Sequence, residues 1–294
     1  MMPSPGARLR AAWVEQPISI PGAFNALTAK LAERLGFSAV YLSGGALSAG
    51  WAGLPDIGLL SLSEFVEQAA VIARATTLPL LCDADTGFGE AINVARTIQL
   101  FEQAGAAGVH LEDQVLPKRC GHLTGKSLIE TSAMAAKIRA AVEARRDPDF
   151  VIIARTDARS VEGFDAAVDR ARAYRVAGAD MIFPEALESA AEFASFAKRV
   201  EGPKIANMTE FGRGPLLTLD ELGGLGYQAA LFPLTAFRAA MHAAELTLKE
   251  LRNAGTQRGI LDQMQTRAEL YELLGYTDWE KRDRGYFSGE PSGS

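Results

Sequence analysis

Eight short hydrophobic runs recur along the chain, and each ends in polar residues. The runs are apolar at consecutive positions rather than at alternate ones, which is typical of parallel strands buried on both faces. Helix-compatible sequence separates them, so the pattern predicts alternating strands and helices. The predicted strands are Ile18–Ile20, Ala39–Ser43, Leu78–Asp83, Val109–Glu112, Phe150–Arg155, Met181–Glu185, Lys204–Asn207 and Ala229–Pro233.

The segments between the runs carry recognisable helix ends. Ser61 stands three residues before Glu64, which is the spacing of a capping box at the start of a helix. Ala133–Ala144 and Asp165–Tyr174 are rich in alanine and charged residues with high intrinsic helix propensity. A glycine is expected where a helix turns back into a strand, and four positions fit this role: Gly36, Gly105, Gly178 and Gly223.

Eight strand–helix units in a chain of 294 residues predict an α/β fold, a closed (β/α)8 barrel of the TIM type. An open, doubly wound sheet is the alternative fold. It usually has fewer strands and a glycine-rich first turn, and no G-x-G-x-x-G motif follows Ile18–Ile20. We expect one domain over residues 1–294, with additional C-terminal helices within 236–275, namely Ala236–Arg252 and Thr256–Leu274. Residues 284–294 are predicted to be a mobile tail.

The composition narrows the classes of function. The net charge is −6 and the isoelectric point is near 5.3, which argues against a general nucleic-acid surface. No apolar run approaches 18 residues and the N-terminus lacks a signal-peptide pattern, so we expect no membrane partner. Two cysteines, Cys82 and Cys120, are too few for a disulfide framework, and this favours the reducing cytoplasm.

Polar and charged residues gather where the predicted strands end. In a (β/α)8 barrel the active site lies at the carboxyl ends of the strands. So many acids with interleaved cations on one rim favour a functional site over ordinary solvation. The residues concerned are Tyr41, Ser43, Asp83, Asp85, Glu112, Asp113, Arg155, Asp157, Glu185, Asn207 and Glu210.

One pentapeptide, Lys118-Arg119-Cys120-Gly121-His122, follows the fourth predicted strand. A thiol beside cations and an imidazole is in a setting that lowers a cysteine pKa. The glycine permits a tight turn or the close approach of a ligand. Taken alone, a short basic run of this kind is more often an ordinary solvated loop, so the rest of the chain decides its interpretation.

The residues together resemble the isocitrate lyase and phosphoenolpyruvate mutase superfamily. The similarity extends over roughly residues 15 to 275, with the motifs in order and at family spacing. The motifs that carry it are Tyr41-Leu42-Ser43-Gly44-Gly45, Gly53-Leu54-Pro55-Asp56, Asp83-Ala84-Asp85-Thr86-Gly87-Phe88-Gly89, Asn93-Val94-Ala95-Arg96-Thr97, Gly108-Val109-His110-Leu111-Glu112-Asp113-Gln114, the pentapeptide, Ala154-Arg155-Thr156-Asp157-Ala158, Phe183-Pro184-Glu185-Ala186, Asn207-Met208-Thr209-Glu210-Phe211-Gly212 and Met264-Gln265-Thr266-Arg267.

The resemblance implies a Mg2+-dependent carbon–carbon lyase of the methylcitrate cycle of propionate catabolism. The expected substrate is the tricarboxylate 2-methylisocitrate, which would yield pyruvate and succinate. The alternatives are a related 2-hydroxy diacid such as 2,3-dimethylmalate, or isocitrate. A catalytically silent barrel that binds carboxylates is a further alternative, which the presence of all the family's charged groups disfavours. The resemblance also implies a homotetramer in which the late helices are exchanged between subunits.

The resemblance further assigns roles to individual residues. Asp83 and Asp85 are the implied ligands of Mg2+, whose preferred donors are oxygens. Cys120 is the implied general acid, with Lys118 and His122 tuning its thiolate. The implied substrate-binding residues are Ser43, Gly44, Gly45, Gly121, Arg155, Glu185, Asn207, Thr209, Arg238 and Arg267.

The chain departs from the family pattern in the loop after the second predicted strand. Ala46 stands where a third consecutive glycine is usual after Ser43, and Trp51 also differs from the usual residue. The resemblance implies that Ser43, Gly44 and Gly45 form a cradle for a substrate carboxylate, and a methyl group at position 46 could reshape its edge. The resemblance implies that Phe183 belongs to an apolar pocket that accepts the extra methyl group of the substrate.

Overall fold

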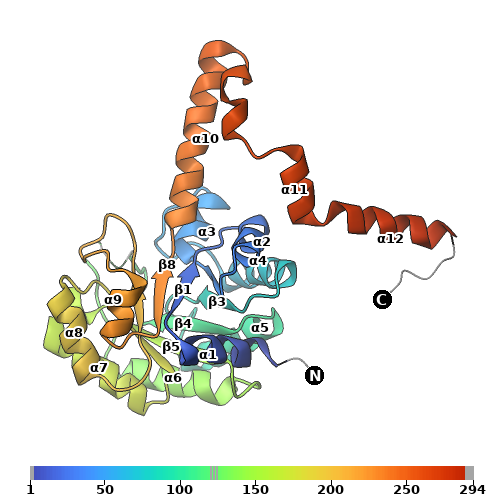
Figure 1. Ribbon diagram of the computed structural model, residues 1–294. Helices are drawn as coiled ribbons and strands as arrows, with labels where there is room; N and C mark the ends of the chain where they lie inside the picture. Colours follow the sequence, from blue (N-terminus) through green and yellow to red (C-terminus); the bar gives the residue numbers. More distant parts are fainter. Residues whose placement is uncertain (1–2, 120, 122, 124, 289–294) are drawn as a thin grey trace. The chain divides into compact units, whose positions relative to one another are not determined.

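The strands of the structure, a computed structural model, form a closed parallel barrel (Figure 1). The structure describes residues 3–119, 121, 123 and 125–288. All eight predicted strands lie within one residue or two of their predicted positions. They are β1 (Ile18–Pro21), β2 (Val40–Leu42), β3 (Leu80–Asp83), β4 (Gly108–Glu112), β5 (Val151–Thr156), β6 (Met181–Pro184), β7 (Ile205–Asn207) and β8 (Ala229–Phe232).

Two short bridges close the barrel. Hydrogen bonding joins β2-β3-β4-β5-β6 into one parallel sheet and β1-β8-β7 into another. A parallel bridge between Gly22 and Tyr41 connects β1 to β2, and one between Ile182 and Lys204 connects β6 to β7. The two sheets therefore form one ring, which confirms the predicted barrel and excludes the open, doubly wound sheet.

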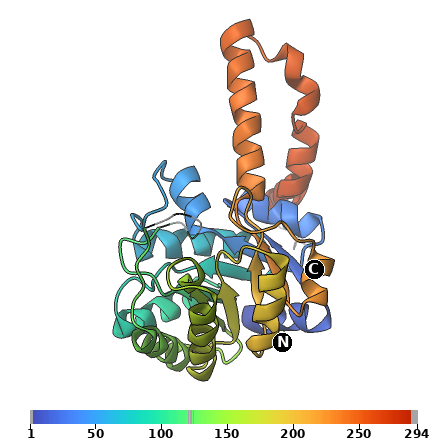
Figure 2. The ribbon, with the colours of Figure 1, turned by 90° about the vertical axis from the view of Figure 1, so that its left-hand side faces the viewer.

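Nine helices and a short 3-10 turn surround the barrel in the described part of residues 1–238 (Figure 2). Ser61 and Glu64 form the predicted capping box at the start of α4. The helices are α1 (Pro5–Glu15), α2 (Ala26–Arg34), α3 (Gly44–Gly50), α4 (Leu62–Ala75), α5 (Ala91–Gln103), α6 (Thr131–Ala144), α7 (Phe164–Val176), α8 (Ala190–Arg199) and α9 (Leu219–Gly224), and the 3-10 turn is η1 (Ala158–Ser160).

Of the four glycines predicted to end a helix, three do so and the prediction for the fourth is wrong. Gly36, Gly105 and Gly178 have φ of 80°, 90° and 107°, the left-handed conformation that glycine adopts without strain. Gly223 instead lies inside α9, which continues to Gly224. Gly226, with φ of 92°, makes the turn into β8.

The strands divide the core into two layers because successive side chains point to opposite faces. In β5, Val151 and Ile153 belong to the cluster inside the barrel, whereas Ile152 and Ala154 belong to the cluster between strands and helices. The inner cluster also contains Leu9 and Trp13 of α1, so this helix packs against the barrel interior. Continuation of the same alternation directs the last side chains of the strands into the mouth of the barrel.

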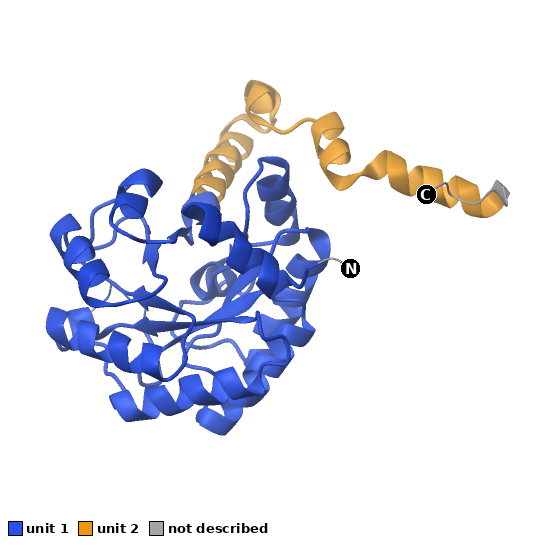
Figure 3. Cartoon of the chain, turned by 60° about the horizontal axis from the view of Figure 1, so that its bottom comes forward, with its two compact units in different colours: residues 1–238 blue, residues 239–294 orange. Residues whose placement is uncertain are grey.

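Residues 239–294 form a second compact unit, separate from the unit of residues 1–238 (Figure 3). The predicted helix Ala236–Arg252 is confirmed within α10 (Thr235–Ala254). The predicted continuous helix Thr256–Leu274 is wrong, since it is divided into η2 (Arg258–Gln263) and α11 (Arg267–Leu274). Thr266 begins α11 because its side chain and that of Glu269 form a capping box there.

The end of the described chain is helical. Helix α12 (Tyr276–Ser288) includes 284–288, so the predicted mobile tail begins too early, and 289–294 lie outside the described residues. The single-domain organisation stays a prediction. Across the described ranges, every helix is too short or too polar to cross a membrane.

Candidate active site

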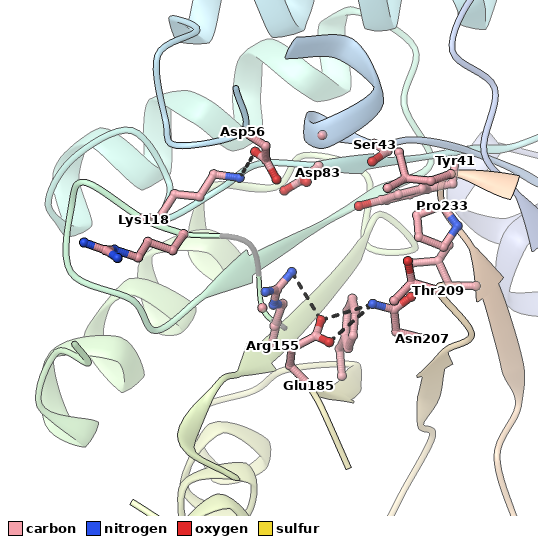
Figure 4. A pocket seen from close by; sticks show the side chains of 16 residues that line it. Tyr41, Ser43, Asp56, Asp83, Lys118, Arg155, Glu185, Asn207, Thr209 and Pro233 are labelled. Atoms are coloured by element: carbon pink, nitrogen blue, oxygen red, sulfur yellow. Dashed lines mark hydrogen bonds and ion pairs between the residues drawn. The ribbon is translucent and has the colours of Figure 1, made fainter. Parts of the chain in front are cut away.

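One pocket lies at the carboxyl ends of the strands, within residues 1–238 (Figure 4). Its lining includes most of the residues predicted to bind substrate or metal. Tyr41, Asp56, Lys118, Arg119 and Phe183 line it as well. The predicted site residues in its lining are Ser43, Gly45, Asp83, Gly121, Arg155, Glu185, Asn207 and Thr209.

Strand alternation and register bring the charged groups of this pocket together. Asp83 ends β3 two residues after the inward-facing Leu81, and Arg155 follows the inward-facing Ile153 in the same way. In the parallel register Glu112 lies opposite Arg155. The ends of β3, β4 and β5 therefore point their ionisable side chains into one space.

Asp83 is a buried carboxylate held in its ionised form. Its Oδ2 accepts a hydrogen bond from the backbone N–H of Gly44, and its Oδ1 accepts one from that of Asp85, each at 3.0 Å. Burial alone would favour the neutral acid, but the nearby His110, Lys118 and Arg155 lower the pKa of Asp83 to about 2. Asp83 therefore carries a full negative charge at neutral pH.

Asp85, two residues later, is set apart from Asp83 by its backbone conformation and its higher pKa. Its φ of 44° is in the left-handed region, which is uncommon outside glycine and re-aims its side chain. Burial raises the pKa of Asp85 to about 6, against the opposing effect of the Lys118 ammonium, whose Nζ lies 2.9 Å from Asp85 Oδ1. Lys118 Nζ also pairs with Asp56.

Glu112 is a second buried acid beside these two. Burial raises the pKa of Glu112 well above its usual range, although Arg155 opposes the shift with Nη1 at 3.3 Å from Glu112 Oε2. The other oxygen, Oε1, is buried and has no hydrogen-bond partner among the described atoms. An orphaned carboxylate oxygen at this depth is suited to bind a further donor, such as a water molecule.

Arg155 is the centre of the cationic part of the pocket. Its guanidinium makes two hydrogen bonds to Asp157, at 2.9 and 3.1 Å, and lies 3.4 Å from Glu185 Oε2. It also lies over the ring of Phe183, 5.3 Å from the centroid. Despite full burial, these carboxylates raise the pKa of Arg155 further. The guanidinium is therefore fixed in position as well as charged.

Glu185 and Asn207 form the wall of the pocket across from Asp83 (Figure 4). Asn207 Nδ2 donates to Glu185 Oε2 at 3.2 Å and to Oε1 at 3.3 Å. The backbone N–H of Ala186 donates to Oε1 at 3.1 Å. The side chain of Asn207 is thereby oriented with its oxygen free to face a donor, and Oδ1 has no hydrogen-bond partner among the described atoms.

The carboxylate cradle predicted at Ser43, Gly44 and Gly45 is the start of helix α3. The Ser43 hydroxyl caps the helix by accepting from the backbone N–H of Ala46 at 3.3 Å. Because the Gly44 N–H donates to Asp83, only part of the predicted cradle faces the pocket. Ala46 is buried and does not line the pocket, and Trp51, the C-cap of α3, is 48% exposed.

The Cys120 pentapeptide is only partly described. Cys120 and His122 lie outside the described residues, so the predicted general acid cannot be placed. Arg119 is fixed by Gln114, whose side chain bonds its backbone N–H and C=O at 2.8 Å each. A Cβ atom at Gly121 would lie within 2.6 Å of Arg155 Nη2, so only glycine fits there. The Lys118 ammonium is engaged by Asp56 and Asp85.

Three predicted substrate ligands, Gly44, Arg238 and Arg267, do not line the pocket, and neither does the predicted metal ligand Asp85. Arg238, in the first turn of α10, donates to the backbone carbonyl of Glu210 at 3.0 Å and lies 5.2 Å from the ring centroid of Phe211. Arg267, the first residue of α11, belongs to the second unit and is exposed.

Three further groups belong to this region, and of their residues His110 and Lys126 were not predicted, whereas Tyr41 and Asp157 were expected at the rim. His110 lies inside the barrel, where burial lowers its pKa to about 4, and its Nε2 is 2.7 Å from the hydroxyl of Tyr41. Burial likewise raises the pKa of the Tyr41 phenol well above its usual range. The alternation within Val109–Glu112 could have revealed His110 as an inward-facing residue. No sequence signal marks the third group, the buried ion pair of Lys126 and Asp157 at 2.7 Å.

The chemistry of the donors is compatible with a hard divalent cation. No group of three or more Asp, Glu, His and Cys side chains within the described ranges is arranged as a complete metal site. Two acids such as Asp83 and Asp85 nevertheless suit Mg2+, which keeps several water ligands and needs few protein oxygens. The ionised state of Asp83 and the unpartnered oxygen of Glu112 fit that requirement.

Comparisons with known proteins show which family and fold this chain shares. The family model described as phosphoenolpyruvate phosphomutase matches residues 9–252. The 2-methylisocitrate lyase of Aeropyrum pernix is 53% identical over 280 residues, which cover 95% of this chain and 90% of that protein. A crystal structure of 2,3-dimethylmalate lyase has a TM-score of 0.91 and 34% identity, with 100% of both chains covered. A phosphonopyruvate hydrolase in complex with oxalate and Mg2+ has a TM-score of 0.88 and 33% identity, over 97% of this chain and 100% of that one.

Proposed function

This chain belongs to the phosphoenolpyruvate phosphomutase family, and from that premise we propose that it is a carbon–carbon lyase that cleaves 2-methylisocitrate to pyruvate and succinate. The observation that carries the proposal is the shared pocket of Asp83, Arg155 and Asn207, in a chain 53% identical to a 2-methylisocitrate lyase. Carboxylate-binding donors stand there beside a site for a hard cation. A 2-hydroxy polycarboxylate requires both.

Asp83 and Asp85 would hold the Mg2+ ion, with Glu112 supporting it through water. The support is the ionised state of Asp83 and the unpartnered Oε1 of Glu112. When bound, the ion would act as a Lewis acid toward the oxygens of the 2-hydroxy acid. The Lys118 ammonium balances the charge of Asp85 and Asp56.

The substrate carboxylates would be bound by the fixed donors of the pocket. Arg155 offers a planar guanidinium that is already oriented by Asp157, and Asn207 and Thr209 add hydrogen bonds. The pocket wall closest to the substrate would be formed by Ser43, Gly44, Gly45 and Gly121. Glu185 would hold the side chains of Arg155 and Asn207 in position by contacting both. Arg238 and Arg267 are proposed as partners of a further carboxylate.

The cleavage moves one proton out of the substrate and one into it. Loss of the hydroxyl proton to a base converts the C–O bond into the carbonyl of pyruvate as the C–C bond breaks. The electron pair of that bond is then carried by the carbon next to a carboxylate of the succinate portion. Cys120 is proposed to return a proton to that carbon from its thiol. Tyr41, whose phenol keeps its proton at neutral pH, is a second donor candidate.

The competing substrate class is a 2-hydroxy diacid such as 2,3-dimethylmalate. The structure of a lyase for that compound shares the fold at 34% identity. A diacid has one carboxylate fewer than 2-methylisocitrate, so it would use fewer of the three arginines Arg155, Arg238 and Arg267. Replacement of Arg238 by Gln should therefore raise the KM for 2-methylisocitrate more than that for 2,3-dimethylmalate.

The direct test measures pyruvate release from 2-methylisocitrate, 2,3-dimethylmalate and isocitrate side by side in the presence of Mg2+. We expect kcat/KM to be highest for 2-methylisocitrate. The extra methyl group, in contact with Phe183, should favour 2-methylisocitrate over isocitrate by about 1–3 kcal/mol, or roughly 10- to 200-fold in kcat/KM. Equal or faster turnover of 2,3-dimethylmalate would overturn the proposed substrate.

We further propose a cytoplasmic homotetramer in which the C-terminal helices are exchanged between subunits. The support is that α10 and α11 bury none of their side chains within the chain, and that large apolar side chains such as Met241, Leu248 and Trp279 are exposed. Light scattering during size-exclusion chromatography should give four times the chain mass of 31.4 kDa. A monomeric mass would contradict the proposal.

A further inference from the structure

Lys126 is a buried lysine that connects two parts of the pocket wall. Its side chain is 1% exposed, and its ammonium donates to Asp157 Oδ1 at 2.7 Å and to the backbone carbonyl of Gly121. We propose that Lys126 is a positioning residue that fastens the loop carrying Cys120 to the Arg155–Asp157 pair. The proposal rests on the lyase function proposed above.

The first contact of Lys126 bears on the substrate-binding arginine. Asp157 Oδ1 accepts from both Lys126 and Arg155 Nη2, and Asp157 Oδ2 accepts from Arg155 Nε. The backbone N–H of Asp157 is held in turn by Asp113 Oδ1 at 2.9 Å. Lys126 is therefore the second cation on the carboxylate that orients the Arg155 guanidinium.

The second contact bears on the loop. Gly121 packs so closely against Arg155 and Glu185 that a Cβ atom would overlap both side chains. Its carbonyl is held by Lys126, and on the other side of position 120 the backbone of Arg119 is held by Gln114. The two sequence neighbours of Cys120 are therefore each held by one buried side chain, Arg119 by Gln114 and Gly121 by Lys126. Of these two side chains, Lys126 is the one that also bonds the carboxylate that orients Arg155.

A purely structural role would not require a lysine at this depth. Burial of an ammonium group costs several kcal/mol before its partners compensate, and an apolar side chain of similar size is often as stable or more so. The ammonium does supply two directed hydrogen bonds to groups that belong to different walls of the pocket. Displacement of a catalytic loop by about 1 Å can lower a rate about 100-fold, so such a link matters for turnover.

The test compares Lys126→Met with Lys204→Met, a matched control. Lys204 is also buried, its ammonium donates to the carbonyls of Val200 and Gly202 at 3.1 and 2.6 Å, and none of these three residues lines the pocket. We expect K126M to lower kcat for 2-methylisocitrate about 100-fold with a smaller change in KM. We expect K204M to lower the melting temperature and to leave kcat unchanged.

Hydrogen exchange measured by mass spectrometry gives a readout that does not depend on turnover. In the enzyme without substrate, K126M should exchange the backbone amides of residues 115–126 at least tenfold faster than the wild type, and K204M should not. If K126M does not fold, Lys126→Gln, which keeps one donor without the charge, is measured in its place. Loop exchange within twofold of the wild type in a folded variant, or an equal loss of kcat in K204M, would overturn the proposal. Failure of the wild type to cleave 2-methylisocitrate would refute the proposed function. The exchange rates would still test whether Lys126 holds the loop in position.

Discussion

The backbone N–H of Gly44 donates a hydrogen bond to Asp83 Oδ2 at 3.0 Å, which joins the first residue of α3 to the last residue of β3. A Cβ atom at position 44 would lie 2.8 Å from that same oxygen and 3.1 Å from Cζ of Phe65. The link therefore depends on glycine. It couples the proposed metal ligand to the proposed carboxylate cradle.

Gly44→Ala should displace the Asp83 carboxylate and lower kcat/KM about 100-fold, because a misplacement of about 1 Å at a reacting centre has an effect of that size. Steady-state kinetics at saturating Mg2+ would measure it. Gly224→Ala is the matched control, since it lies in α9 and a Cβ there meets nothing within 4 Å. The control should gain up to about 1 kcal/mol of stability without losing activity. Wild-type activity in Gly44→Ala would contradict the coupling.

Removal of divalent cations should abolish turnover, and added Mg2+ should restore it. Asp83→Asn removes a negative charge from the proposed ligand set, so we expect the half-saturating Mg2+ concentration to rise at least tenfold. Asp165→Asn, an exposed acid in the first turn of α7, serves as the control and should leave that concentration unchanged. Titration of each chelator-treated protein with Mg2+ would measure both. An unaltered Mg2+ requirement in Asp83→Asn would remove Asp83 from the metal site.

The two cysteines should differ sharply in reactivity. Cys82 is fully buried, and burial together with the nearby Asp83 raises the pKa of its thiol well above the usual range. Iodoacetamide at neutral pH should therefore modify the native protein at Cys120 and spare Cys82. Peptide mass spectrometry would locate the label. Modification of Cys82 at a comparable rate would contradict this difference.

Cys120→Ser should lower kcat about 10²- to 10⁴-fold if the thiol is the general acid, because general acid–base groups contribute that much. Cys82→Ser provides the comparison for the loss of a thiol outside the pocket. Pyruvate release from 2-methylisocitrate would be followed for both variants. Turnover of Cys120→Ser at the wild-type rate would show that another group, such as Tyr41, returns the proton.

Lys204 should make the stability of the protein depend on pH. Burial lowers the pKa of Lys204 below 10.5. Between this lowered pKa and 10.5, the unfolded chain therefore binds more protons than the folded chain. The free energy of unfolding contributed by Lys204 therefore rises with pH from its lowered pKa toward 10.5. Urea unfolding of the wild type and Lys204→Met at pH 7 and pH 9.5 would measure this. The stability difference should shift in favour of the wild type at the higher pH, and a shift in the opposite direction would refute the assignment.

Much of the barrel could be predicted because its signal is local. Runs such as Phe150–Ala154 are apolar at every position since one half of their side chains faces the barrel interior and the other half faces the helices. The same alternation places Asp83 and Arg155 at the mouth. Helix ends were predictable where a capping side chain or a left-handed glycine marks them, as at Ser61 and Gly105.

Other features depended on contacts between residues far apart in the sequence. Gly223 and Gly226 are both compatible with a helix end, and packing placed the left-handed turn at Gly226. The break within Thr256–Leu274, by contrast, has a local signal that the prediction missed, because Thr266 and Glu269 form a capping box inside an otherwise helical pattern. Arg238 resembled a substrate ligand in sequence, but in the structure it is engaged by Glu210 and Phe211.

The sequence by itself determined which ionisable residues end the strands, because a side chain's face in a strand depends only on its position along that strand. The tertiary structure decided which charges meet. Lys118 pairs with Asp56 and Asp85, and Lys126 pairs with Asp157 across 31 residues, because loops from different strands close over one another. Neighbouring charges and burial together then set the pKa of each acid, since Asp83 and Asp85 are two residues apart, are both buried, and have pKa values of about 2 and about 6.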